Sequence, residues 1–548
     1  MQTSRVYKMI CMFLVIAVVV AAIVGCGKSS QTSQPSEQEN QQENIQTENT
    51  QKDELVLAVR SEPDDGFDPT TGWGRYGSPL FQSTLLTFDD ELNVVNDLAV
   101  NYLISEDGLT WTVEIRDDVV FSDGVPLTAQ DVVYTFETAK SSGSVVDLNV
   151  LESIEAVSDY TIEFTLERTH SAFIDILITL GIVPKHAHGS GYGEHPVGSG
   201  PFTFVQWDKG QQLIIERNPK YYGKQPNFRK ITFLYLDENT ALAAAKAGQV
   251  DLAAVPAAFG LQIVNNMRVE ALQSVDNRGI LFPFVPAGQT SADGLPVGND
   301  VTADLAIRQA INVGINRAAL VEGVLEGFGT PAYTVADGLP WWNSDTVIED
   351  ADFEAAKAIL RDGGWEETAA DGILRKGDIK AEFRLVYPIS DNTRQSLALA
   401  VADLIRPLGI NIIPEGKSWD DIGRIKHSDA VLFGWGAHTP LEMYHLHSSE
   451  MAGSGWFNSG FYSNPQVDEY MAKALAAGTV EEANQYWQKA QWDGSTGISA
   501  KGDAPWAWLV NLDHVYFVHE QLDIGNQRVQ PHGHGWPVTA NIVDWQWK

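Results

Sequence analysis

The sequence predicts an α/β protein folded into at least two lobes. Segments typical of strands alternate with segments typical of helices over hundreds of residues, and no repeat period is visible. The part of the chain that follows a polar N-terminal stretch is roughly 500 residues long, which is more than one hydrophobic core usually supports. Together these observations predict layered α/β lobes rather than a single domain.

The strands and helices are expected in an order that local patterns indicate. Residues 55–59 form a short apolar run typical of a buried strand, and residues 102–120 alternate like a hairpin with a turn at 105–108. Thr128 followed by Asp131 marks the start of a helix. By the same signals we expect strands at 160–166, 250–253 and 411–413, and helices at 239–248, 303–323, 353–363 and 391–408.

The first 25 residues have the order of a secretory signal. Arg5 and Lys8 precede an apolar run that ends at Val24, and Gly25 stands directly before Cys26. A cysteine at this place is similar to the lipobox of bacterial lipoproteins, in which the thiol is acylated. The apolar run is shorter than the ~20 residues that span a bilayer. We therefore predict a lipoprotein signal peptide over 1–25 and lipidation at Cys26, rather than a transmembrane anchor.

The stretch that follows the signal is polar. Residues 26–52 consist largely of Ser, Gln, Glu, Asn and Thr, with almost no apolar side chain. Such a composition cannot bury enough surface to offset the entropy lost on ordering. We expect a disordered, lipid-anchored tether that keeps a globular body near the membrane and free to reorient.

Composition excludes several classes of function. The chain has 2 Cys, at positions 11 and 26, so a processed and acylated protein would keep no thiol for a disulfide, a nucleophile or a metal ligand. The formal net charge of −35 makes nucleic acid and anionic lipid surfaces poor partners. A secreted hydrolase is disfavoured because Gly-x-Ser-x-Gly and His-Glu-x-x-His are both absent.

Seven sequence blocks occur in an order and spacing that is similar to one family. They resemble the dipeptide-, oligopeptide- and nickel-binding family of ABC-transporter solute receptors, and the resemblance covers essentially all of the body after the tether. Gly198 and Gly200, before Pro201, are expected in a tight crossing between lobes. The blocks are 107–112 (DGLTWT), 115–124 (IRDDVVFSDG), 127–133 (LTAQDVV), 198–202 (GSGPF), 218–223 (NPKYYG), 247–251 (AGQVD) and 307–312 (IRQAIN).

The resemblance implies a two-lobed clam-shell of the periplasmic-binding-protein type (type II), with an extra subdomain in the first lobe. It implies lobe I over 53–285, lobe II over 286–512, and a segment over 513–548 that returns to lobe I. Such lobes close on a ligand by a hinge motion. The implied protein is a receptor and not an enzyme, works with an ABC permease and ATPase, and lies on the extracytoplasmic face of the membrane, held there by its lipid. We expect a monomer.

Two segments supply the first candidate ligand-binding residues. Trp73, Arg75 and Tyr76 lie in a glycine-rich loop after the first strand, and an Arg between aromatic rings suits a planar anion such as a carboxylate. Trp435 looks like a tryptophan that lines the pocket of nickel-binding relatives, and His438 follows it just before a predicted helix. Thr439, Pro440 and Glu442 are expected to form a capping box, which makes Glu442 a cap rather than a ligand.

The resemblance is greatest to the nickel and opine-metallophore branch. It implies a cargo in which a metal is chelated by small carboxylate- and imidazole-bearing molecules, with Tyr444 at the ligand and His438 or His445 as a direct metal ligand. No intrinsic cofactor is expected, and nickel or another divalent metal enters only within the chelate. Nickel-binding relatives hold the chelate with an Arg near an Ile-Val-Pro segment, but residues 179–184 contain no Arg, so Arg75 or Arg278 would have to replace it.

Two other readings of the site remain open. A receptor for short peptides would need an acid for the peptide amine, which Asp429 or Glu442 could supply. The His-Gly-His sequence at 532–534 suggests a metal site, but it lies in the segment expected to complete the first lobe. The sequence therefore favours a metal-chelate receptor, with a peptide receptor as the alternative.

Overall fold

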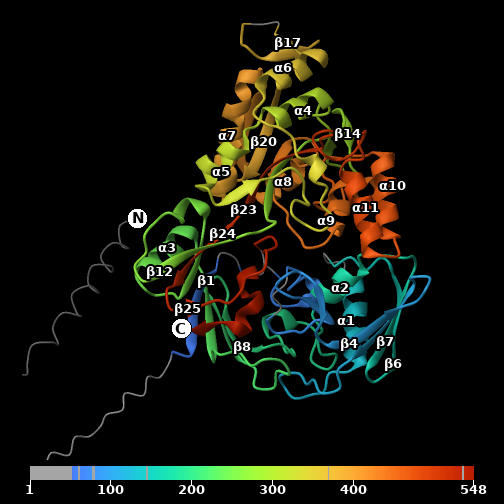
Figure 1. Ribbon diagram of the computed structural model, residues 1–548, viewed down its shortest axis with the longest axis vertical. Helices are drawn as coiled ribbons and strands as arrows, with labels where there is room; N and C mark the ends of the chain where they lie inside the picture. The colour runs from blue at the N-terminus through green and yellow to red at the C-terminus, as the bar shows by residue number, and fades with distance from the viewer. Residues whose placement is uncertain are drawn as a thin grey trace, which may run out of the picture. The chain divides into compact units, whose positions relative to one another are not determined.

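The computed structural model describes residues 52–59, 62–63, 65–76, 80–142, 146–367, 370–533 and 536–548. The predicted signal peptide, nearly all of the tether, Cys26 and His534 lie outside these residues. None of the helices in the described ranges is both long and apolar enough to cross a bilayer. Two large sheets and one smaller sheet organise the described chain (Figure 1).

The first large sheet has seven strands in the order β12-β24-β11-β1-β10-β9-β8. β1 is parallel to β10 and β11, and the other pairs are antiparallel. Helix α3 (Glu238–Lys246) packs on one face, and the C-terminal 3-10 helix (Pro537–Asp544) lies on the other. The strands are β1 (Glu54–Val59), β8 (Phe202–Asp208), β9 (Gln212–Arg217), β10 (Lys230–Tyr235), β11 (Leu252–Val255), β12 (Met267–Leu272) and β24 (His514–His519).

The smaller sheet belongs to a separate layer with its own core. It has the order β4-β5-β7-β6 and packs against α1 (Ala129–Ser142) and α2 (Phe173–Thr179) (Figure 1). The predicted hairpin is confirmed as β4 and β5, with Gly108 in its turn, and Asp131 accepts hydrogen bonds from Thr128 as predicted. The strands are β4 (Ala99–Ile104), β5 (Thr110–Ile115), β6 (Leu151–Ser158) and β7 (Thr161–Leu166), and a two-stranded ribbon, β2 (Leu86–Phe88) with β3 (Val94–Asn96), adjoins them.

The second large sheet has six strands in the order β16-β23-β13-β22-β20-β21. Its side chains alternate between two cores, as the period of two in a strand requires: Leu432 packs with α4–α7, while Val431 and Phe433 pack with α8–α11. The strands are β13 (Asn277–Leu281), β16 (Gly329–Pro331), β20 (Glu382–Pro388), β21 (Asn411–Lys417), β22 (Ala430–Phe433) and β23 (Trp506–Leu512). The helices are α4 (Leu305–Gly314), α5 (Arg317–Leu325), α6 (Phe353–Asp362), α7 (Asn392–Ile405), α8 (Trp419–Ile425), α9 (Leu441–His447), α10 (Pro465–Leu475) and α11 (Val480–Gln491).

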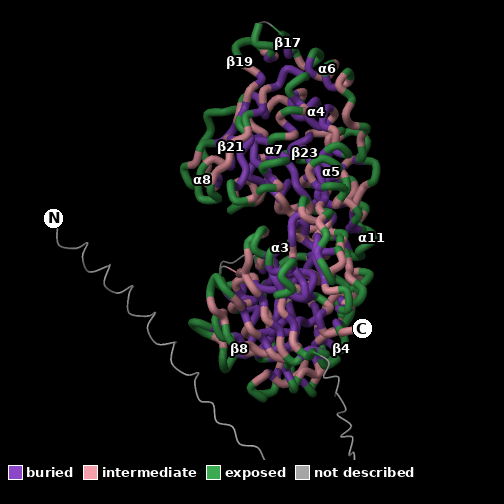
Figure 2. The backbone as a smooth tube through the Cα atoms, turned by 90° about the vertical axis from the view of Figure 1, so that its left-hand side faces the viewer, coloured by how far each residue is buried: buried purple, intermediate pink, exposed green. Residues whose placement is uncertain are grey.

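The chain passes between the two large sheets twice. It leaves the first sheet after β12 and enters the second at β13, and it returns from β23 to β24 across Asp513. The predicted boundary after residue 285 lies beyond the first of these crossings, because β13 already pairs with β22 and β23. In Figure 2 the buried backbone gathers within the layers of each sheet, and segments such as α8 and β8 are more exposed.

Two local predictions are wrong for identifiable reasons. The single helix expected at 303–323 is two helices, because Ile315 and Asn316 are extended and the Asn316 side chain caps α5 by accepting from Ala319 N. Gly198 and Gly200 do not lie in a crossing between the large sheets. They pack against the backbone of Phe81, close to the start of β8.

Several of the family-like blocks hold the scaffold together. The Asn218 side chain donates to Gly200 O over 2.8 Å, and Asp251 accepts from Val56 N over 2.9 Å. Asn312, on α4, donates to Trp506 O over 3.0 Å and so ties its helix to β23. These contacts account for the residue types without any role in binding.

Candidate functional site

The edges of the two large sheets where ligands are expected face each other. In open α/β sheets, ligands bind beyond the carboxyl ends of parallel strands. In the first sheet β1 and β10 end there, and in the second β20, β21 and β22 do. Asn392, which follows β20, donates over 3.4 Å to Glu238, which follows β10. The loops after these strands are therefore the place to look for a site.

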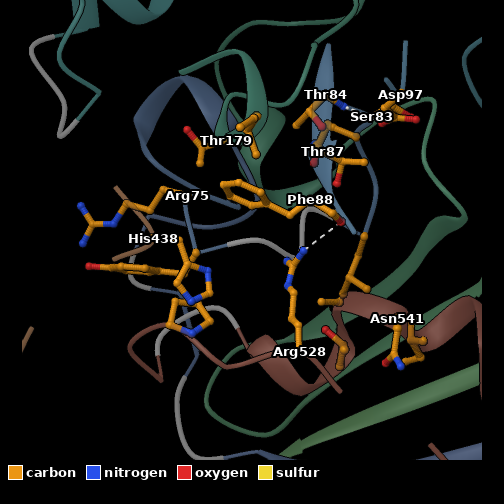
Figure 3. A pocket seen from close by; sticks show the side chains of 18 of the residues that line it. Arg75, Ser83, Thr84, Thr87, Phe88, Asp97, Thr179, His438, Arg528 and Asn541 are labelled. Carbon is orange, nitrogen blue, oxygen red and sulfur yellow. Dashed lines mark hydrogen bonds between the residues drawn. The ribbon is translucent and has the colours of Figure 1, made fainter. Parts of the chain in front are cut away.

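A cavity of about 310 Å³ is lined in part by two of these loops, the loop after β1 and the turn after β22. Its lining comes from the loop after β1, from β2 and the residues before it, from the turn at 437–439, and from the C-terminal segment. Figure 3 shows Arg75 and His438 on one side, Asp97 and Asn541 on the other, and Phe88 between them. Arg528 also reaches the cavity and donates to Phe88 O over 3.2 Å. The cavity brings together three predicted ligand-binding residues: Arg75, Tyr76 and His438.

His438 enters the cavity as a neutral imidazole. Burial, and to a lesser extent the charge of Arg528, lowers the pKa of His438 to about 3. Its ring lies 6.1 Å from that of Phe88 in an edge-to-face arrangement, and its Nε2 is shielded from solvent without a hydrogen-bond partner in the described residues. A neutral ring nitrogen can accept a hydrogen bond or bind a transition metal.

Thr439, next to His438, is held by an acid from another layer of the fold. Its hydroxyl donates to Asp175 Oδ2, on α2, over 2.5 Å. Burial raises the pKa of Asp175 to about 7. The expected capping box is not formed: α9 begins at Leu441, and the Glu442 carboxylate instead accepts from Gly436 N and Ala437 N. Glu442 therefore stabilises the turn that carries His438, and each of its two carboxylate oxygens accepts one of these backbone hydrogen bonds.

The Asp175 contact predicts a pH dependence of stability. The carboxyl of an unfolded Asp has a pKa of about 3.9, well below the value of about 7 in the folded protein. Its stabilising contribution is therefore complete below about pH 4 and is lost as the pH rises through about 7. We expect Asp175 to cost stability as the pH rises from about 4 to about 7, so the melting temperature of the wild type should fall relative to that of Asp175→Asn over this range.

Differential scanning fluorimetry across this pH range, at constant ionic strength, checks the expectation. Glu442, whose pKa burial also raises to about 7, contributes equally to the wild type and the variant and cancels in the comparison. Asp378→Asn, at an exposed position in the second lobe, is the matched control. Parallel melting curves for wild type and Asp175→Asn would contradict the assignment.

A chain of contacts leads from the cavity to the first crossing between the sheets. The Arg75 guanidinium lies 4.7 Å from the centre of the Tyr76 ring, and the Tyr76 ring lies 6.0 Å from that of His532. His532 Nδ1 is 2.5 Å from Asp276 Oδ1. His514 Nε2 lies 3.1 Å from Asp276 Oδ2. His532 therefore lies at the first crossing between the sheets, which we call the hinge.

Asp276 joins this hinge to Arg278. Burial acts to raise the pKa of Asp276, but Arg278, His532 and His514 outweigh it and hold the pKa well below its usual range. Arg278 binds Asp276 and also donates from Nη1 to Asn277 O over 2.7 Å. The carboxylate is therefore charged, and it positions Arg278 at the start of β13.

Arg278 is one of two buried arginines that meet at the carboxyl end of β22. A Cβ at Gly434 would lie 2.4 Å from Arg278 Nη1 and 2.8 Å from Arg394 Nη2, so both guanidinium groups flank this glycine. Arg394 binds Asp391 over 2.5 Å. Burial, together with the charge of Arg278, lowers the pKa of Arg394 to about 10. The Nε atoms of both arginines are buried without a partner in the described chain.

The structure places five predicted site residues outside the lining of the cavity, namely Arg278, described above, and four others. Trp73 is 6% exposed and packs against Phe67. The Trp435 ring packs on Phe457, and the ring of His445 stacks on that same Phe457, 4.3 Å away. The Tyr444 hydroxyl donates to Glu450 over 2.7 Å. Their roles in ligand or metal binding stay predictions.

Sequence reasoning missed Arg394 and Arg528. Arg394 lies in the first turn of α7, directly after β20, and an Arg at the start of a helix that follows a parallel strand is a usable signal. Arg528 lies in an irregular segment near the C-terminus and has no such signal, because its place at the cavity depends on how that segment folds back.

Comparison with known proteins decides the family. The model of bacterial extracellular solute-binding proteins, family 5, matches residues 93–455. Protein XP55 of Streptomyces lividans is 32% identical over 487 residues, which is 86% of each chain. This chain belongs to that family. Its relatives are solute-binding receptors of ABC importers and not enzymes, and they act outside the cytoplasm.

Solved structures of the family share the fold. NikZ from Campylobacter jejuni, in complex with Ni(L-His), has a TM-score of 0.77 and 26% identity, and the match covers 90% of this chain and 99% of NikZ. AppA from Bacillus subtilis, in complex with a nonapeptide, has a TM-score of 0.72 and 25% identity over 91% of this chain and 99% of AppA. The two large sheets are thus the lobes of a clam-shell, as the resemblance implied.

Proposed function

We propose that this receptor captures a small chelate of nickel, or of another divalent metal, whose organic part bears a carboxylate and an imidazole. The observation that carries the proposal is His438, a neutral imidazole with a shielded Nε2 that lines the cavity beside Arg75. A chelated metal with one open position is a suitable partner for such a nitrogen.

The metal is expected to arrive with its own ligands. Among the residues that the structure describes, no group of three or more His, Asp or Glu side chains is placed to hold an ion. The described residues therefore supply at most part of a coordination sphere. The cavity volume of about 310 Å³ lies at the lower end of the range for small-molecule sites, ~300–1,000 Å³.

The carboxylate of the chelate is assigned to the arginines. Arg278 and Arg394 present two guanidinium groups side by side, and a guanidinium binds carboxylates through paired hydrogen bonds. In this proposal the pair takes the role of the Arg that residues 179–184 lack. Arg278 was predicted for that role from the sequence, and Arg394 is added to it. NikZ, with its Ni(L-His) ligand, supports the same chemistry.

A short peptide is the second candidate. AppA binds a nonapeptide, and glutathione-binding proteins are among the relatives, at 28% identity over 83% of this chain. Every peptide carries a carboxylate for the arginine pair, but His438 is a poor partner for a peptide amine, and Glu442 already accepts two backbone hydrogen bonds. The chelate therefore fits the turn at 436–439 better than the peptide does.

Thermal stabilisation separates the two candidates. A ligand at about 100 times its dissociation constant adds ~2.7 kcal/mol to the free energy of unfolding. We expect nickel with L-histidine to raise the melting temperature of the full chain, and nickel alone, L-histidine alone and glutathione to raise it less. Stabilisation by peptides and none by the nickel chelate would overturn the proposal.

Replacing His438 tests its role directly. We expect His438→Ala to weaken binding of nickel–L-histidine tenfold or more, since even partners that do not touch a metal contribute roughly 10–100-fold to its affinity. Isothermal titration calorimetry measures the change. His186→Ala removes a half-exposed histidine that pairs with Asp123 in the first lobe, and serves as the control. Equal affinities for wild type and His438→Ala would exclude His438 as a ligand.

Membrane attachment is part of the proposed function as well. Lipidation at Cys26, the tether up to residue 52 and a monomeric receptor remain our proposals, and they would hold the two lobes beside an ABC permease. Mass spectrometry of the protein after expression in a lipoprotein-processing host would detect the acyl groups.

A further inference from the structure

A segment of the first lobe lies against the second lobe at residues 170–172. The layer of the smaller sheet, to which this segment belongs, is inserted between β1 and β8, so the chain joins it to the first lobe. Phe173 packs in the core of that layer. Ala172, its neighbour, is 3% exposed and packs instead with the core around α8–α11. The segment therefore bridges the two lobes.

Ser171 caps a helix that belongs to the other lobe. The last carbonyl groups of an α-helix have no partner in the regular hydrogen-bond pattern of the helix. The Ser171 amide donates to Leu475 O over 2.8 Å, and the Ser171 hydroxyl donates to Ala474 O over 2.9 Å. Both carbonyl groups lie in the last turn of α10. Ser171 thus supplies two hydrogen bonds that cross from one lobe to the other.

Two other polar contacts flank this segment. On α2, one turn further along the chain, Asp175 accepts the hydrogen bond from Thr439 described above. Asp147 Oδ2 lies 3.8 Å from His445 Nε2, on α9. Asp175 and Thr439 line the cavity, whereas Ser171 does not. The contact between the lobes therefore extends beyond the cavity wall, and Ser171 lies in the part that does not face a solute in the cavity.

We propose that residues 170–172 are a latch, whose contacts form when the lobes close on a solute and break when the lobes part. The lobes of a clam-shell move about a hinge, and the contacts of the latch cross between them. Water replaces each hydrogen bond when the lobes open, so the latch favours closure without locking it. Because the latch stabilises only the closed form, it strengthens binding of every solute that this form holds. The inference rests on the fold and not on the chelate, and so goes beyond the proposed function.

The Ser171 amide reports on the latch in the absence of solute. Hydrogen exchange, resolved to single amides by mass spectrometry, measures its protection in the full chain. We expect intermediate protection in the wild type, weaker than that of the amides of β5, because the latch opens with the lobes whereas a core strand opens only on wider unfolding. Ala172→Trp places a ring where Ala172 packs, so we expect it to remove the protection of Ser171 and to leave that of β5 unchanged. Ala247→Trp, at an exposed position directly after α3, is the matched control.

Two results of this experiment would overturn the latch. Exchange of the Ser171 amide as slow as that of the β5 amides would mean that the lobes do not part at this contact. Equal exchange of the Ser171 amide in wild type and Ala172→Trp would mean that contact with the second lobe does not protect it.

Affinities measure what the latch contributes to binding. Ser171→Ala removes one of the two hydrogen bonds, and we expect it to weaken binding about two- to tenfold. We expect Ala172→Trp to weaken binding roughly tenfold or more, because overpacking opposes closure. Both losses should appear as faster dissociation, since the latch forms after the solute has entered. Calorimetry and stopped-flow fluorescence with nickel–L-histidine and with glutathione measure them, and Ser141→Ala, which removes an exposed hydroxyl that donates to Thr138 O, is the control.

Probes that bind should lose affinity by the same factor, whatever their chemistry. A loss confined to one of two bound probes would assign Ser171 to the solute site, and unchanged affinities would mean that the contact does not follow closure. Either result would overturn the latch. Failure of nickel–L-histidine to bind would count against the proposed function alone, because exchange of the Ser171 amide decides the latch without any solute.

Discussion

Arg394→Ala is expected to weaken binding of a carboxylate-bearing solute roughly 100-fold. A hydrogen bond to a charged group contributes about 1.5–3 kcal/mol, and a guanidinium offers a carboxylate two of them. Arg394 is the better target of the arginine pair, because removing Arg278 would leave Asp276 buried with less compensation at the hinge.

Arg394→Lys separates charge from geometry. Lysine keeps the positive charge but loses the planar fork, so we expect it to recover only part of the affinity. Arg424→Ala is the matched control, since Arg424 is an exposed arginine on the neighbouring α8 that pairs with Asp421. Calorimetry with the probe that stabilises the wild type measures all three variants. An affinity of Arg394→Ala within about twofold of wild type would remove Arg394 from the site.

Gly198→Ala is expected to destabilise the protein by about 3 kcal/mol or more, at the upper end of single substitutions. A Cβ at this position would lie 1.9 Å from the carbonyl oxygen of Phe81, which is a backbone atom and cannot turn aside. The same carbonyl accepts from Gly200 N over 2.7 Å, so a shift would also break the pairing that leads into β8. Overpacking that must move backbone is among the costlier substitutions.

Urea unfolding, followed by circular dichroism, measures the loss of stability. The urea concentration at the midpoint of unfolding should fall, while the dependence of the free energy of unfolding on urea stays the same. Gly323→Ala is the control, because its added Cβ meets nothing within 4 Å and it lies within α5, where Ala is favoured over Gly by up to about 1 kcal/mol. Unfolding of Gly198→Ala at the wild-type midpoint would mean that the irregular segment around Phe81 can move without cost.

Local patterns predicted most of the individual elements. The alternation in β5, the capping pair at α1 and the amphipathic α6 depend on neighbours within a few residues, and each lies close to its predicted bounds. The long helix at 303–323 failed because the polar Asn316 caps a new helix in the middle of an apolar pattern. The capping box failed because Glu442 found two backbone donors in the preceding turn rather than at the helix end.

The candidate site was predictable only in part. Arg75 and His438 stand out by residue type beside glycines, and they do meet in one cavity. Trp73 and Tyr76 are both aromatic residues next to glycines, but Trp73 is buried in a hydrophobic core. Which side chains of a short loop point inward depends on how the loop folds, and the local sequence does not show this.

The sequence by itself determined the α/β class, the two-lobed receptor family and the candidate chemistry of an Arg and a His at the ligand. Those properties follow from local periodicity and from ordered motifs that a chain carries wherever it folds. Only the tertiary structure decided that Arg278 and Arg394, more than a hundred residues apart, flank one glycine, and that Asp276 ties them to His514 and His532 at the hinge. The physical reason is that the carboxyl ends of the parallel strands β20 and β22 and the start of the antiparallel β13 share one edge of the sheet whatever their distance along the chain, so the site forms from segments that become neighbours only after folding.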